Sequence, residues 1–232
     1  MKHAVEFALV VGLAVISSLL IYVYYDELAS FFLDANPVYR GLAIFSLCFI
    51  STSSIIFPIP YTAAILSLTA RIPEINLLEI ALWGGLGSGL GEVVGWILGL
   101  YFRRQVEDSQ YGNRLKIISR LASGRRGRWL VPVLIFLFAY TFLPDDIIFI
   151  VLGTIRYSLP IALVAGVVGK ASMLYTIGLF GSFIGESTST LPDWVPIALS
   201  IVLFLGFLAV VRFVDWESIL DRYSGDVGES AK

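Results

Sequence analysis

The chain has 232 residues, of which 57% are hydrophobic and 15% are charged, and its mean hydropathy is +0.85. Soluble domains carry about 25% charged residues, so this chain has too few to cover a water-exposed surface. Its one cysteine, Cys48, and its one histidine, His3, exclude a disulfide within the chain and argue against a Cys/His metal site. The composition therefore predicts a membrane protein without a cofactor.

Four apolar segments are long enough to cross about 30 Å of hydrocarbon as helices. They cover residues 4–25, 77–101, 160–184 and 195–213. The first one exceeds the roughly 7–15 apolar residues of a signal peptide, and no A-x-A-like cleavage site follows it. We therefore interpret it as a retained span.

Two further apolar regions are interrupted by proline. Residues 41–72 contain Pro58 and Pro60, and residues 130–157 contain Pro144. Proline cannot continue the helical hydrogen-bond ladder and restricts the residue before it. Each region therefore splits into two arms, and is either one kinked span or a re-entrant hairpin with its proline at the tip.

The distribution of Lys and Arg favours the hairpins. Segment 102–128 holds eight of the sixteen basic residues, and short loops this basic are normally cytoplasmic. With a cytoplasmic N-terminus and two hairpins, 13 basic residues lie inside, Arg40 and Arg71 lie outside, and Lys170 lies within a span. Full spans would put 102–128 and the C-terminus on opposite faces. We therefore predict hairpins, with both termini in the cytoplasm.

The predicted fold is an all-α polytopic membrane protein with four transmembrane helices and two opposed re-entrant hairpins in an inverted repeat. Residues 1–40 form the first span and an external loop, 41–184 the core, and 185–232 the last span and a cytoplasmic tail. Within the core, hairpin 41–72 precedes span 77–101, basic loop 102–128 follows, and hairpin 130–157 precedes span 160–184. Inverted repeats with broken helices near the midplane recur in transporters, because irregular backbone at that depth must be buried in protein or line a watery cavity.

Several ionisable residues fall at membrane depth. Glu92 and Lys170 lie nine and ten residues from the predicted cytoplasmic ends of their spans, about 14–15 Å deep. Asp145 and Asp146 lie at the second hairpin tip, and Arg156 lies at its base. Because such groups usually face a cavity or each other, we predict a site for a charged headgroup or for protons. The alternative is a static Glu92–Lys170 pair that fixes helix register, with Asp145 or Asp146 capping a short helix.

A glycine stripe follows the Glu92 helix, and small residues of this kind let another backbone approach closely. In the second span, Gly166 precedes Lys170 by one turn and is expected to give the lysine side chain room. The stripe consists of Gly87, Gly91, Gly95 and Gly99.

Three motifs within 41–184 resemble the DedA superfamily, also called the VTT or SNARE-associated Golgi protein family. They are Phe57-Pro58-Ile59-Pro60, Gly91-Glu92-Val93-Val94-Gly95-Trp96-Ile97-Leu98-Gly99, and Thr141-Phe142-Leu143-Pro144-Asp145-Asp146 followed by Leu152-Gly153 and Arg156-Tyr157. The resemblance implies opposed hairpins and movement of phospholipids or polyprenyl phosphates between leaflets, with some members depending on the proton gradient.

The chain departs from the family's better-known pattern at both hairpins. An acid often follows the first hairpin's proline, where this chain has Tyr61 and Thr62. Arginines often flank the second hairpin's proline, where it has Thr141 and Ile147. Arg156 and Lys170 would have to contact a phosphate in their place.

Three classes of function remain. The leading hypothesis is a lipid translocase or scramblase. The second is a proton- or cation-coupled transporter of a small solute, in which Glu92 and the Asp145/Asp146 pair titrate. The third is a membrane assembly or homeostasis protein without transport. An enzyme is not expected, because no His or Cys nucleophile lies at a candidate site. The expected partners are membrane lipids, protons or cations and, in a homo-oligomer, a second copy, but not nucleic acid; the expected location is the cell membrane.

Overall fold

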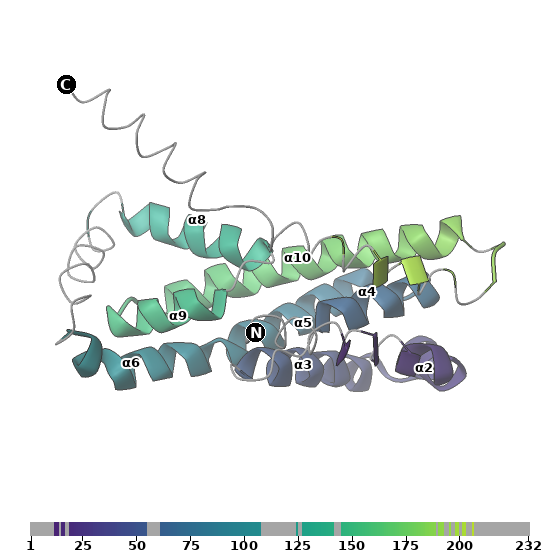
Figure 1. The fold of residues 1–232 in the computed structure, drawn as a ribbon, viewed down its shortest axis with the longest axis horizontal. Helices are drawn as coiled ribbons and strands as arrows, with labels where there is room; N and C mark the ends of the chain where they lie inside the picture. Colours follow the sequence, from purple (N-terminus) through teal and green to yellow (C-terminus); the bar gives the residue numbers. More distant parts are fainter. Residues whose placement is uncertain are drawn as a thin grey trace, which may run out of the picture.

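The computed structural model of the chain describes residues 19–54, 61–107, 127–141, 145–188 and 190–192, together with the single positions 12, 13, 15, 16, 124, 195, 198, 199, 201, 202 and 206. Within these ranges all regular structure is helical, which confirms the predicted all-α class for this part of the chain. The helices are α2 Tyr25–Asp34, α3 Pro37–Ser53, α4 Tyr61–Arg71, α5 Leu77–Gly91, α6 Val93–Glu107, α8 Gly127–Tyr140, α9 Asp145–Thr154 and α10 Leu159–Ser187 (Figure 1).

Two long helical rods dominate the structure. α5 and α6 are separated only by Glu92, and the hydrogen bonds from Glu92 N to Ser88 O (3.1 Å) and from Trp96 N to Glu92 O (3.2 Å) carry the helical ladder through the break. Together they give an apolar helix over Leu77–Gln105, which we call rod 1. Rod 2 is α10. Each rod has 29 residues and is long and apolar enough to cross a membrane.

The described residues support two of the four predicted spans, with longer bounds than predicted. Hydropathy placed the spans at 77–101 and 160–184, but each helix continues through polar residues at its end. Half of the predicted span 4–25 and most of the predicted span 195–213 lie outside the described residues. The same is true of Pro58, Pro60, Pro144 and most of 102–128.

The segment before residue 40 that was predicted as an external loop contains helix α2. Asp26 and Glu27 lie in its first turn, where carboxylates are favoured by the partial positive charge of the helix N-terminus. At the other end, the Arg40 guanidinium donates to the carbonyl of Phe32 at 2.6 Å. These charges stabilise the ends of the helix.

The two rods cross in antiparallel directions through small residues. The Gly85 position lies against Ala171, and the Gly89 position lies against Val167. The order of the contacts is reversed along rod 2, so the rods run oppositely. A side chain at either glycine would collide with the partner helix, and this close packing is the usual role of small residues at helix crossings.

Helices α3 and α4 form a hairpin beside one half of the rods. α3 runs in the same direction as α5, since Gly41 lies against Trp83, Gly87 against the carbonyl of Phe45, and Gly91 against Thr52. α4 packs on the last half of α10, where Gly181 meets Thr69 and Leu66 and Gly185 meets Ala70. The end of α3 therefore lies beside the middle of rod 1.

Helices α8 and α9 make the same arrangement at the other end. Gly169, in the first half of α10, lies against Ala139 and the carbonyl of Phe136 from α8. α9 packs on α6, where Gly99 lies against the carbonyl of Ile150 and Gly153 against the carbonyl of Trp96. In Figure 1, α8 and α9 lie toward the α6 end of the molecule, whereas α2 and α4 lie toward the opposite end.

The contacts of the two halves are equivalent. We call α3, α4 and rod 1 the first unit, and α8, α9 and rod 2 the second. A shift of 82 residues relates Gly85 on rod 1 to Val167 on rod 2, and Gly89 to Ala171. The contact of Gly85 with Ala171 is therefore the counterpart of the contact of Val167 with Gly89.

Aromatic contacts on the first arms repeat in the same way. The rings of Phe45 and Phe49 stack with centroids 5.9 Å apart, and those of Phe136 and Tyr140 stack at 6.1 Å. The second pair lies 91 residues after the first in the sequence. The two pairs lie beside equivalent glycines of the rods, Gly87 and Gly169. A two-fold relation thus connects the units within the described residues.

Candidate functional site

A buried ion pair joins the two rods near their middle. Lys170 Nζ on rod 2 lies 3.3 Å from Glu92 Oε1 on rod 1, and the two side chains are 7% and 0% exposed. Burying either charge alone costs several kcal/mol, so each residue needs the other. The structure thus brings together two residues that the sequence placed at one depth on different spans.

The carboxylate of Glu92 lies against Gly166 of the second unit, close to Phe149. A Cβ at Gly166 would lie 3.3 Å from Glu92 Oε2 and 3.0 Å from Phe149 Cζ, and Phe149 on α9 is fully buried. Gly166 was expected to give room to Lys170, but the groups nearest to this space are Glu92 and Phe149. The absence of a side chain at Gly166 therefore leaves room for Glu92 rather than for Lys170.

Hydroxyl groups continue the polar layer from Glu92 toward α3. Ser88, one turn before Glu92, is fully buried, and its Oγ donates to the carbonyl of Gly84 at 2.8 Å. Thr52 Oγ1 lies 2.8 Å from the carbonyl of Cys48 and 3.0 Å from that of Ser88. A band of buried polar groups thus extends from α3 across rod 1 to rod 2.

Both hairpins approach this level from opposite ends of the rods. Thr52, near the end of α3, lies against Gly91, next to Glu92. Phe149, near the start of α9, lies against Gly166 beside the carboxylate. The ion pair is therefore at the height where the first arm of one hairpin ends and the second arm of the other begins.

The second-hairpin acids are placed only through their backbone. α9 begins at Asp145, so both aspartates lie in its first turn, where carboxylates are favoured. The side chains of Asp145 and Asp146 lie outside the described residues, as do the prolines of both tips. Among the described residues, no group of three or more His, Cys, Asp or Glu side chains could hold a metal ion.

Arg156 is not brought to the ion pair. It lies seven residues beyond Phe149, about 10 Å along the chain at helical rise, and its side chain is exposed. Its φ of 55° is left-handed. The bonds from Arg156 N to Gly153 O (3.0 Å) and from Tyr157 N to Leu152 O (2.9 Å) form the helix-ending motif that usually has glycine at this position.

This terminus is attached to rod 1 by Trp96, whose Nε1 donates to the carbonyl of Tyr157 at 3.2 Å. Trp96 lies one turn after Glu92 on the same rod. The hydrogen bond fixes where α9 ends relative to α6, and with it the height of Arg156 at the base of the second hairpin.

The predicted glycine stripe lies at backbone contacts with both hairpins. Gly87 and Gly91 pack against α3, and Gly99 packs against α9. Gly95 between them is buried. One glycine stripe therefore serves the first hairpin at one end and the second hairpin at the other, with Glu92 between the two contacts.

The outer faces of the rods are apolar. On rod 1 the exposed large side chains recur at helical spacing, and rod 2 has a similar exposed face. Soluble proteins rarely expose apolar patches of this extent. The two rods therefore present hydrocarbon on their outer faces and bury the Glu92–Lys170 pair between them. The exposed residues are Leu78, Leu82, Leu86, Leu90, Ile97, Tyr101 and Phe102 on rod 1, and Ile161, Val164, Val168, Tyr175, Leu179, Phe180 and Phe183 on rod 2.

A second ion pair was missed by the sequence analysis. Arg40 on α3 binds Glu79 on α5 through two contacts, Nε to Oε1 at 3.1 Å and Nη2 to Oε2 at 3.0 Å. The residues are 39 positions apart, so no local pattern connects them. The pair lies at the start of rod 1 and fixes the entry of the first hairpin.

No protein-family model, curated protein or solved structure matches the chain. The resemblance to the DedA superfamily therefore depends on the three motifs quoted above. Of these, the glycine-rich motif of rod 1 contains Glu92.

Proposed function

We propose that the chain is a multi-pass membrane protein of the DedA type that moves lipids between leaflets. Glu92 and Lys170 form the polar site that the lipid headgroup contacts as it crosses. The observation that carries the proposal is the ion pair itself: two opposite charges, 3.3 Å apart and buried between two apolar-coated rods. Ionisable groups at membrane depth usually face a pathway or each other.

The position of the pair fits the middle of a bilayer. Rod 1 is about 43 Å long at 1.5 Å per residue, and Glu92 lies about 22 Å from its start at Leu77. A hydrocarbon core of about 30 Å centred on the rod would thus have the pair near its midplane. The exposed leucines of rod 1 would then face lipid tails.

The opposed hairpins would reduce the apolar distance that a headgroup must cross. α3 ends beside Gly91, and α9 starts near Glu92. In this placement each hairpin enters from one face and turns back near mid-depth. Irregular backbone at such tips is tolerated only if it is buried in protein or lines a watery cavity.

A phospholipid headgroup has chemistry that can replace the pair. Its phosphate can accept hydrogen bonds from the Lys170 ammonium, and an ammonium on the headgroup can donate to the Glu92 carboxylate. The pair therefore offers one contact of each sign, and the two charges balance each other when no lipid is bound.

Reconstitution tests the proposal. Purified protein is placed in liposomes with a fluorescent lipid in both leaflets, and a membrane-impermeant quencher is added outside. Translocation predicts quenching beyond the outer-leaflet half, whereas empty vesicles stop near half. No acceleration over empty vesicles with phosphate-only, zwitterionic and anionic headgroups would contradict the proposal.

A second candidate is a proton-coupled transporter of a small solute. It is favoured by the neutrality of the pair, since one carboxylate balances one ammonium and leaves no excess positive charge for an anion. Protonating Glu92 would free Lys170 to bind an anionic solute. This candidate predicts solute uptake driven by an imposed pH gradient and lost in Glu92→Gln, with the lipid assay silent.

A further inference from the structure

An apolar cavity lies on the outer side of the first hairpin, away from the ion pair. It has a volume of about 280 Å³ and is lined by α2, α3, α4 and the two residues Leu20 and Ile21. Every lining side chain is hydrocarbon. The lining residues are Leu20, Ile21, Leu28, Phe31, Phe32, Ala43, Ile44, Leu47, Ala64, Ile65 and Leu68.

We infer that this space, which we call the α3–α4 cavity, binds one acyl chain of a membrane phospholipid, with the headgroup at the end nearest Arg40 and Arg71. The inference depends on the proposed placement in the membrane, but not on lipid translocation. A volume near 280 Å³ is at the lower end of the range of ligand pockets.

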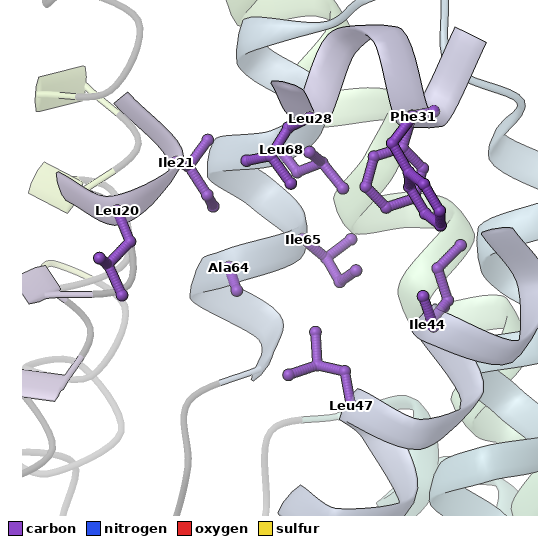
Figure 2. Close-up of a pocket in the computed structure, with 11 residues that line it drawn as sticks. Leu20, Ile21, Leu28, Phe31, Ile44, Leu47, Ala64, Ile65 and Leu68 are labelled. Atoms are coloured by element: carbon purple, nitrogen blue, oxygen red, sulfur yellow. The ribbon is translucent and has the colours of Figure 1, made fainter. Parts of the chain in front are cut away.

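The lining residues extend over a range of depths in the proposed placement. Figure 2 shows Leu28 and Leu68 at one end and Leu47 at the other, with Ala64 and Ile65 between them. Leu47 lies two residues after Phe45, which packs against Gly87 near the middle of rod 1. The Leu47 end is therefore deep, and the Leu68 end is toward the start of the rod.

Two arginine side chains lie toward the shallow end, Arg71 beside Tyr25 and Arg40 in its pair with Glu79. Arg71 lies one helical turn after Leu68, and its guanidinium lies 4.0 Å from the ring centroid of Tyr25, which is one turn before Leu28. Arg40, paired with Glu79, lies seven residues before Leu47, about 10 Å at helical rise. A phosphate beside these arginines would have its tail extending through hydrocarbon toward mid-depth.

The cavity also opens onto the apolar exterior. Leu20 is 52% exposed and Leu47 is 37% exposed, although both line it. A chain of CH₂ groups gains nothing by moving from lipid to an apolar wall, so binding here depends on close packing and on the headgroup contact. An acyl chain can therefore enter through this opening from the surrounding lipid, while its headgroup stays at the height of the arginines.

Photolabelling tests the inference in full-length protein reconstituted in phospholipid vesicles. The probes are two phospholipids with a diazirine either near the carboxyl end or near the methyl end of one acyl chain. Labelled peptides are mapped by mass spectrometry. We expect labelling concentrated on α2, α3 and α4, with the carboxyl-end probe near Leu28 and Leu68 and the methyl-end probe near Leu47 and Ala64.

The variant Ala64→Phe fills the space without adding a polar atom. It should lower labelling of α3 and α4 roughly tenfold, which corresponds to about 1.4 kcal/mol of lost binding. The matched control Val164→Phe adds bulk to an exposed position of rod 2 and should leave the labelling unchanged.

Carbonate-resistant membrane association first establishes that each variant is inserted. For an inserted protein, uniform labelling of all lipid-facing helices, or labelling unchanged by Ala64→Phe, would overturn the inference. The same results would follow if the chain's own N-terminal residues or a second copy filled the space. Lipid translocation is measured separately. If the protein does not move lipids, the inference that the α3–α4 cavity binds an acyl chain still stands.

Discussion

Glu92 and Leu174 occupy equivalent positions in the two units, 82 residues apart, yet only one of them is charged. The Gly166 position lies against Glu92, and the equivalent Gly84 position lies against Leu174. The same shift relates Lys170 to Ser88, which is buried and bonds to its own helix. The rods therefore have a charged pair on one side of their crossing and a neutral leucine–serine pair on the other.

This asymmetry predicts a stability experiment. Lys170→Met leaves the Glu92 carboxylate buried without its cation and should destabilise the fold by about 3–5 kcal/mol. The double variant Glu92→Leu with Lys170→Ser copies the neutral side of the crossing and should recover most of that loss. Unfolding in mixed micelles measures both. A double variant as unstable as Lys170→Met would contradict the equivalence of the two sides.

Gly166→Ala should disturb the site more than the fold. The added methyl would lie 3.3 Å from Glu92 Oε2 and 3.0 Å from Phe149 Cζ, so the carboxylate or the ring must shift by a few tenths of an ångström. We expect translocation to fall severalfold, with a stability loss of about 1 kcal/mol. Translocation equal to that of the unmodified protein would show that the position of Glu92 is not critical.

The contact between α6 and α9 should be among the least tolerant of added volume. A Cβ at Gly99 would collide with the carbonyl of Ile150, so Gly99→Ala must separate two backbones and should cost about 1–3 kcal/mol. The control is Gly12→Ala, where an added Cβ meets nothing within 4 Å. The melting temperatures of the two variants in detergent should differ, and equal values would argue against this close packing.

The opposed entry of the hairpins can be tested with single cysteines. The background is Cys48→Ala, which places alanine where the second unit has the equivalent Ala139, so the fold should survive. Asp34→Cys lies before the first hairpin, and Ser158→Cys lies after the second; both positions are exposed.

A membrane-impermeant maleimide added to intact cells should label position 34, and position 158 should react only after the cells are opened. Labelling of both positions from the same side would contradict the predicted topology. Labelling of neither in opened cells would show that these ends are buried in an assembly, which the opposed arrangement does not predict.

Much of the fold follows from simple sequence patterns. Long apolar segments ending near polar loops located both rods, because hydrocarbon-length helices need about 20 such residues. Their ends were predicted too short, since hydropathy marks only the apolar part of a helix and rod 1 continues as helix through Arg103 and Arg104. Helix α2 was not predicted, because its 10 residues are too few for the hydropathy criterion that identifies membrane spans.

The candidate site was only partly predictable. Equal depth from the span ends placed Glu92 and Lys170 at one level, but which faces of the rods meet depends on the Gly85 and Gly89 contacts across the crossing. The left-handed Arg156 gave no signal, because glycine is the usual marker of that helix ending. The Arg40–Glu79 pair depends on tertiary packing alone.

The most direct test of the central claim is the rate of lipid translocation in Glu92→Gln. The matched control is Glu186→Gln, the same chemical change at an exposed position of α10. With equal amounts of folded protein in the liposomes, the account predicts that Glu92→Gln falls to the rate of empty vesicles and that Glu186→Gln keeps the unmodified rate. Equal rates for both variants and the unmodified protein would contradict the assignment of the buried pair as the step that lipids cross.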